Sequence, residues 1–181
     1  PNSNTPSAST YAIGTTDFTF AKFDLTSTGE DIKVTQFNVL FGTSSVVTAT
    51  SVVADAADVN NVRVYEGETL LGTDSTLSSG KAEFGLNITI LKNSTKTLTI
   101  KGDVPIGSDA AYLYVHVYGS YITATGQSSA QTITTSAAGG YARGNLMTKG
   151  APTQLIQHIW GQKNLPPTFA EKREGSSPVN T

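Results

Sequence analysis

Residues 111–118 read Ala-Tyr-Leu-Tyr-Val-His-Val-Tyr, in which aliphatic and aromatic side chains alternate without a break. Successive side chains of a β-strand point to opposite faces, so this stretch predicts a strand with an aliphatic face and an aromatic face. Residues 84–90 also alternate, there between apolar side chains and Gly, Asn or Thr. We therefore expect the aliphatic residues of both stretches to lie in a core: Leu86, Ile88, Leu113, Val115 and Val117.

Short strand-like runs continue on both sides of these two stretches, separated by turn-forming residues. Within residues 17–149 no segment shows a 3.6-residue apolar period long enough for a helix, which excludes a βαβ architecture. The pattern predicts an all-β domain, an Ig-like antiparallel β-sandwich of about nine strands. The expected strands are 18–25, 32–41, 46–53, 62–65, 70–73, 84–90, 96–100 and 111–118, with weaker candidates at 122–125, 132–134 and 146–148. Changes of apolar phase near Ala21 and Gln36 indicate β-bulges.

The two ends of the chain differ from this pattern. Residues 1–16 are rich in Asn, Ser, Thr and Pro and predict an N-terminal arm or linker. Residues 150–181 follow the sandwich (17–149) and predict a C-terminal docking segment or linker that contains a short amphipathic helix. A helix of about ten residues is marginal in water, so we expect its apolar face to pack against a sheet, more readily a neighbouring copy's than its own. That face consists of Leu155, Ile156, Ile159 and Trp160, and we expect Trp160 to be largely buried.

Composition excludes several classes of function. Charged residues are 14% of the chain, whereas Ser and Thr together make up 45 of the 181 residues, a balance typical of extracellular strand proteins. The net charge is −2 and the Lys and Arg residues are scattered, which argues against nucleic-acid binding. Cysteine is absent, so disulfides and thiol chemistry are excluded. No apolar run is long enough for membrane insertion. We therefore expect an extracellular, cell-surface location.

Three stretches carry a family resemblance: residues 20–35, 62–73 and 87–104. They are similar to a repeated β-sandwich module of large prokaryotic surface proteins, including surface-layer-like and adhesin-like chains. The resemblance covers roughly residues 17–149. It implies a role as a spacer or as a part of a lattice or filament, and it supplies no catalytic residues.

The aromatic face of residues 111–118 is the first candidate site. Aromatic rows stack on sugars or anchor protein interfaces, in which Tyr is enriched. Three alternatives remain open for this row: cover by the same chain or a neighbouring subunit, sugar binding, or exposure without a role. As contacts for assembly or for a glycan we name Tyr112, Tyr114, His116 and Tyr118, together with Leu155, Ile159 and Trp160.

Two weaker candidates concern metal and carbohydrate. Asp55, Asp58 and Asn60 have the oxygen chemistry that Ca²⁺ prefers, although Asp and Asn also cap turns without any metal. Asn87 and Asn93 each begin an Asn-x-Ser/Thr sequence, the acceptor motif for N-glycosylation. We expect no resident cofactor other than this possible calcium ion.

Catalytic motifs are not found in the sequence. His116 and His158 are the only histidines, and no nucleophile elbow, zinc-protease motif or phosphate loop is present. We therefore expect the chain not to be an enzyme. The leading hypothesis is a structural subunit of a prokaryotic extracellular polymer, a filament, pilus-like fibre or surface layer that binds other copies of itself through its terminal segments. The alternative is a glycan-binding or adhesive module using the tyrosine row, and a third is an accessory domain of a larger enzyme.

Overall fold

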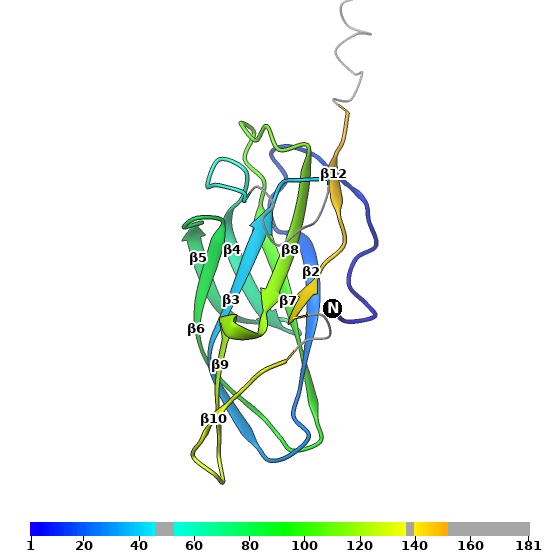
Figure 1. The fold of residues 1–181 in the computed structure, drawn as a ribbon. Helices are drawn as coiled ribbons and strands as arrows, with labels where there is room; N and C mark the ends of the chain where they lie inside the picture. The colour runs from blue at the N-terminus through cyan, green and yellow to red at the C-terminus, as the bar shows by residue number, and fades with distance from the viewer. Residues whose placement is uncertain (46–52, 137–139, 152–181) are drawn as a thin grey trace, which may run out of the picture. The chain divides into compact units, whose positions relative to one another are not determined.

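The chain folds into two β-sheets that face each other (Figure 1). The computed structural model describes residues 1–45, 53–136 and 140–151. The chain divides into two units, Pro1–Gly150 and Ala151–Thr181, and everything below concerns the first. The expected helix at the C-terminal end, with Leu155, Ile159 and Trp160, lies outside the described residues.

The smaller sheet has four antiparallel strands in the order β2-β7-β4-β5. Their bounds are Phe18–Thr26 (β2), Thr95–Asp103 (β7), Asn60–Glu66 (β4) and Thr69–Thr76 (β5). β4 and β5 form a hairpin whose turn contains Gly67 at a φ of 57°, a left-handed conformation that glycine adopts without strain. β2 and β5 are the two edges of this sheet.

The larger sheet is organised around β3 (Ile32–Gly42). β6 (Lys81–Ile90) pairs along one side of it, and β8 (Tyr112–Tyr118) and β9 (Ile122–Gly126) share the other side. A 3₁₀ turn, η1 (Gly119–Tyr121), joins β8 to β9. His116 and Ile122 are six residues apart in the chain. Their partners on β3, Leu40 and Phe37, are only three residues apart.

Four short strands complete the outer side of the larger sheet. β10 (Thr132–Ile133) pairs with β9, whereas β11 (Tyr141–Arg143) and β12 (Met147–Lys149) pair with β8. β1 (Thr10–Tyr11) then pairs in parallel with β12, the one parallel pairing among the described strands. The other strand pairings of this sheet are antiparallel.

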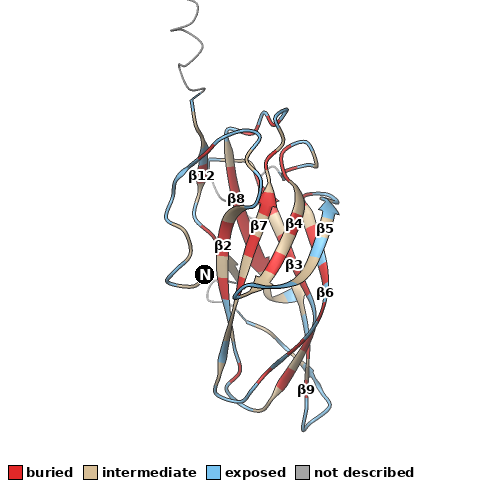
Figure 2. Ribbon diagram, turned by 180° about the vertical axis from the view of Figure 1, so that it is seen from behind, coloured by how far each residue is buried: buried red, intermediate tan, exposed pale blue. Residues whose placement is uncertain are grey.

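The core lies between the sheets and follows the alternation in the sequence (Figure 2). All five predicted core residues are buried, with exposures of 7% or less. Both predicted bulges are also present, as register shifts between Thr19 and Ala21 in β2 and between Val34 and Gln36 in β3. The second bulge keeps Val34 and Phe37 on the same buried side although they are an odd number of residues apart.

The prediction of a two-sheet, nearly all-β fold is confirmed, but the strand inventory differs. The described residues contain twelve strands instead of about nine. β1 and β11 were not predicted, because each has only two or three residues and depends on pairing with a distant partner. The strand expected over 46–53 lies, except for Val53, outside the described residues.

The first sixteen residues lie along the sandwich. The main-chain N–H of Asn2 donates to the carbonyl of Lys22 at 2.8 Å, and that of Gly14 donates to Val104 at 2.8 Å. Tyr11 is 2% exposed, and its hydroxyl donates to the carbonyl of Ala110. Burial, helped by the charge of Asp58, raises the pKa of Tyr11 to about 12. The segment predicted as an arm or linker is therefore part of the first unit in this structure.

Truncating the core tests the strand phase. Val115 is 0% exposed, so Val115→Ala should lower the free energy of unfolding by about 1–3 kcal/mol through lost burial and a residual cavity. Leu70→Ala is the control, because Leu70 is 50% exposed and its truncation should change stability by less than about 0.5 kcal/mol. Urea unfolding followed by circular dichroism measures both. Equal effects would contradict the assignment of Val115 to the core.

Candidate functional site

The aromatic row of β8 forms part of a larger cluster. Ring centroids of Tyr114 and His116 lie 4.9 Å apart, and those of His116 and Tyr118 lie 6.0 Å apart. Tyr141 of β11 stacks on His116 at 5.1 Å, and Tyr121 of η1 meets Tyr118 edge-on at 5.1 Å. The alternation predicted from the sequence thus holds, but Tyr141 was missed because β11 was missed.

The middle of the row is covered by the chain itself. Tyr114 and His116 are each 2% exposed, whereas Tyr118, Tyr121 and Tyr141 are half-buried, as is Tyr112 at the start of β8. Tyr114 lies directly over its cross-strand partner Gly42, where a β-carbon would come within 2.2 Å of the ring. Tyr114 and His116 are therefore unavailable to a glycan or a neighbouring subunit in this structure.

His116 has an unusual environment for a histidine. Among the described residues, neither of its ring nitrogens has a hydrogen-bond partner, and the hydroxyl of Tyr114 has none either. Removal from water disfavours the charged imidazolium, and the positive charge of Arg143 adds to this, so the pKa of His116 falls to about 4. The imidazole is consequently neutral at neutral pH.

This shift predicts a pH dependence of stability. The imidazole of the unfolded chain takes up a proton near its ordinary pKa of 6.5, but that of the folded chain does so only near 4. The unfolded state therefore binds more protons in this window, and the free energy of unfolding should fall by about 3 kcal/mol as the pH drops from 6.5 to 4.

Below the folded pKa, both states carry the proton and this contribution levels off. The measurement is urea unfolding across this pH range. His116→Phe is the control, because it keeps an aromatic ring and removes the titration. A variant whose pH profile matched that of the wild type would contradict the assignment.

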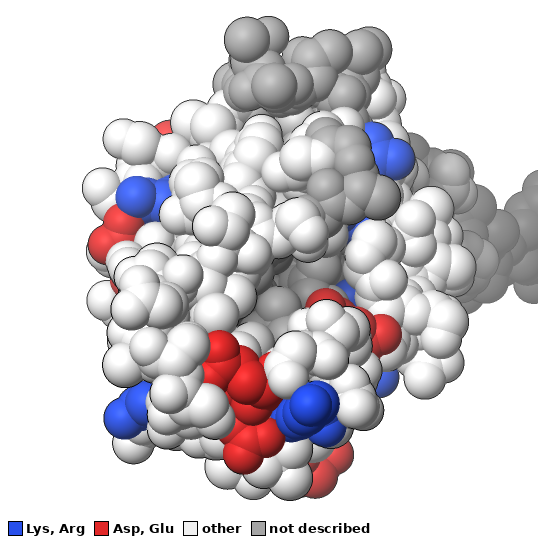
Figure 3. Space-filling view, turned by 60° about the horizontal axis from the view of Figure 1, so that its bottom comes forward, with Lys and Arg blue, Asp and Glu red and all other residues white. Residues whose placement is uncertain are grey.

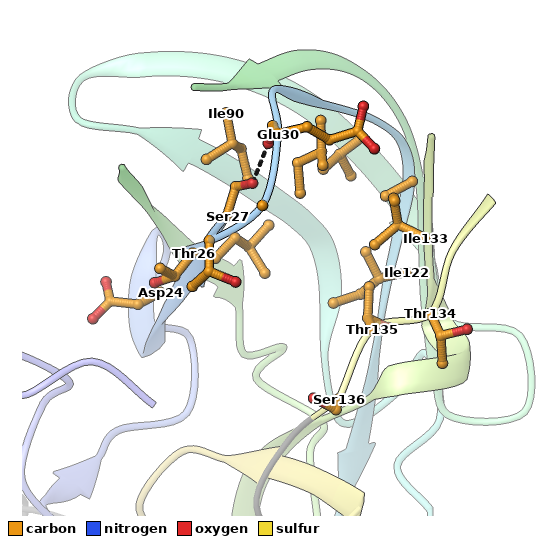
Figure 4. A pocket seen from close by; sticks show the side chains of 16 residues that line it. Asp24, Thr26, Ser27, Glu30, Ile90, Ile122, Ile133, Thr134, Thr135 and Ser136 are labelled. Carbon is orange, nitrogen blue, oxygen red and sulfur yellow. Dashed lines mark hydrogen bonds between the residues drawn. The ribbon is translucent and has the colours of Figure 1, made fainter. Parts of the chain in front are cut away.

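A cleft of about 390 Å³ opens between the two sheets at the end of the sandwich where β3 begins (Figure 4). Apolar side chains from β2, β3, β6, β9 and β10 line it. They are Leu25, Ile32, Val34, Ile90, Ile122, Ala124 and Ile133. The surface of this end is hollowed, with acidic side chains beside the hollow (Figure 3).

The rim of the cleft is polar and comes from two segments. One is the end of β2 with the turn that follows it, residues 24–30, and the other is the run Thr134–Thr135–Ser136 after β10. The carboxylate of Glu30 accepts hydrogen bonds from the main-chain N–H groups of Ser128 and Ser129, at 2.7 and 3.0 Å. The Ser129 hydroxyl donates to the same carboxylate, and this bond, followed by the two main-chain bonds, lowers the pKa of Glu30. They tie the turn before β3 to the turn after β9.

The cleft continues along β2. A smaller cavity of about 70 Å³ shares Asp24, Leu25 and Ile122 with it and extends to Pro1 and Tyr118. The two together form an apolar channel that follows the edge of β2 from the turn before β3 toward the start of the chain.

The edge of β2 beside this channel is only partly paired. The main-chain N–H and C=O of Lys22 point away from β7, to Thr5 Oγ1 at 3.1 Å and to the N–H of Asn2 at 2.8 Å. Main-chain groups of alternate residues in an antiparallel strand point to the same edge, so those of Asp24 and Thr26 point the same way. Within the described ranges β2 pairs with no strand other than β7.

The two aspartates predicted to bind calcium accept hydrogen bonds from nearby groups of the chain. Asp55 Oδ1 accepts from the N–H groups of Ala57 and Asp58, and Asp58 Oδ1 accepts from the hydroxyl of Ser108 at 3.3 Å. Asn60 is the first residue of β4. The part of the chain that the structure describes contains no group of three or more His, Cys, Asp or Glu suited to a metal. The turn-capping alternative accounts for the contacts of both aspartates.

Both glycosylation motifs lie on the surface. Asn87 is exposed on β6, and Asn93 is exposed in the turn between β6 and β7, where its φ is 57°. An enzyme that attaches a glycan would therefore find both side chains accessible in this unit.

Comparisons with protein-family models, with curated proteins and with solved structures found no match. The resemblance to prokaryotic surface modules therefore stays a prediction from the sequence. Within residues 1–45, 53–136 and 140–151, no helix has the length and apolarity needed to cross a membrane.

Proposed function

We propose that this chain is a non-catalytic structural module of a prokaryotic extracellular polymer, built on an Ig-like β-sandwich and joined to other copies through its terminal segments. The observation that carries the proposal is the apolar channel beside an incompletely paired edge strand. An unpaired edge is a template for another chain, and β-strand addition at such an edge is a common mode of assembly.

The charges of the smaller sheet favour a structural role over binding of a charged ligand. Arg63 binds Asp103 at 3.0 Å and Asp17 at 3.0 Å, and Lys101 binds Asp17 at 2.8 Å. Asn61 adds a hydrogen bond to Asp103. Charges paired in this way tie the residue before β2 to β4 and β7.

The state of the histidine also favours a non-catalytic role. A general base must reach the proton that it removes, but His116 is buried and its ring nitrogens contact no described polar group. His158 lies outside the described residues. The hydroxyl of Ser27, which lines the cleft, donates to the Glu30 carbonyl, and that of Ser129 donates to the Glu30 carboxylate.

Deleting residues 151–181 tests the proposal, because this removes one terminal segment and leaves the first unit. We expect the truncated chain to keep the β-sheet circular dichroism and urea midpoint of the full chain and to lose association in sedimentation velocity experiments. A chain that lacks only residues 171–181 is the control and should associate normally, since it retains Leu155–Trp160. Normal association of the chain lacking 151–181 would contradict assembly through this segment.

A glycan-binding module is the second candidate, because Tyr118, Tyr121 and Tyr141 form a half-exposed cluster with ring centroids 5.1 and 5.8 Å apart. Aromatic faces of this kind stack on sugar rings. A polysaccharide panel decides between the two candidates. Under the structural proposal no polysaccharide binds, whereas an affinity that Tyr121→Ala abolishes and Tyr65→Ala preserves would favour the glycan module. Tyr65 lies on β4 of the other sheet.

A further inference from the structure

We propose that the channel along β2 is the acceptor site for residues 152–165 of a second copy of this chain, bound in an extended conformation. This inference rests on the proposed function, because it names the surface on which one copy holds the next. The channel is defined by the two cavities that share Asp24, Leu25 and Ile122.

The edge of β2 offers main-chain hydrogen-bonding groups to an added strand. Asn2 and Thr5 of the same chain already occupy the edge of β2 at Lys22. Two residues further on, the main-chain groups of Asp24 and Thr26 face the same side and have no strand partner among the described residues. An added strand would satisfy these donors and acceptors, and only an extended segment places its own main-chain groups at the matching spacing.

The cleft, with a volume of about 390 Å³, is too small to enclose a ten-residue helix, which is ~15 Å long and ~10 Å across. The cleft instead suits a few apolar side chains. In an extended segment Ile156 and Trp160 lie on one face, because they are an even number of residues apart. Their entry into the cleft would cover Ile122 and Ile133, which are only partly buried.

At the Ile32 end of the cleft, the length of the segment favours a second copy over the chain's own residues. The cleft includes Ile32, at the start of β3, whereas β12 pairs with the start of β8, beside Gly42 at the end of β3. Ten residue steps along β3 span ~34 Å. Leu155 is four residues beyond Ala151 and reaches at most ~14 Å. Trp160 reaches ~32 Å only if fully stretched, so it falls short of the Ile32 end of its own cleft.

The cleft and the segment carry charges of opposite sign. The residues that line the cleft include Asp24 and Glu30 and no Lys or Arg. Residues 152–165 include Lys163 and His158 and no Asp or Glu. The acceptor and the segment are therefore complementary in sign, and a contact between the two ends of different copies repeats head to tail without closing.

Trp160 is the only tryptophan of the chain, so its fluorescence reports directly on the segment. In the full chain, its emission should move to shorter wavelength as the protein concentration rises, in step with association measured by sedimentation. Far-UV circular dichroism should show no gain of helix in the associated state, because the segment binds as a strand.

The decisive variant blocks the rim of the cleft with Thr134→Arg and Ser136→Arg, at two exposed positions. The control carries Thr73→Arg and Ser75→Arg, an equally exposed Thr and Ser with the same spacing on β5. We expect the rim variant to need at least a tenfold higher protein concentration than the wild type for both the fluorescence shift and the association. The control should behave like the wild type. Urea midpoints of all three proteins verify that they fold.

The outcomes separate this inference from the proposed function. A rim variant that associates and shifts like the wild type overturns the acceptor site and leaves the structural role standing. If Trp160 of the wild type emits at short wavelength at every concentration, and the rim variant moves this emission to longer wavelength, the chain fills its own channel. That result overturns binding of a second copy. A wild type that never associates overturns the proposed function as well.

Discussion

The register of β3 with its two neighbours is the constraint on which the rest of the first unit depends. β3 is the only described strand of the larger sheet that pairs along most of its length on both sides, with β6 on one and with β8 and β9 on the other. A slip of one residue would exchange the two faces of the strand. Phe37, Val39 and Phe41, all fully buried, would then leave the core.

The pairing of β3 contains two irregularities, a bulge within β3 and the turn η1 between its partners β8 and β9. The bulge between Val34 and Gln36 allows apolar residues of opposite parity to face the same core. η1 inserts three extra residues on the opposite strand, and this places Tyr121 near Tyr118 on the outer face. The outer face of β8 is thereby packed in its middle, where Tyr114 lies over Gly42 and His116 stacks with Tyr141. β8 is buried on both faces, although only one of them belongs to the core between the sheets.

The opposite end of the sandwich is less complete. β10 and β11 have only two and three residues, and no described strand of the larger sheet pairs with β2. On this side, isoleucines that belong to the core also line the cleft. Among the described residues, the cleft therefore lies beside an edge of β2 that has no strand partner.

The sequence by itself determined the nearly all-β architecture, the core residues of β6 and β8, both bulges and the aromatic row, because each follows from a period of two along the chain or from a break in it. Only the tertiary structure decided whether the second face of β8 is covered, since Tyr141 and Gly42 are far from Tyr114 and His116 in sequence. It also decided the places of Tyr11 and of β1, whose two residues carry no periodicity of their own. The cleft was beyond prediction for the same reason: its lining comes from five strands, and a gap between strands leaves no pattern in any of them.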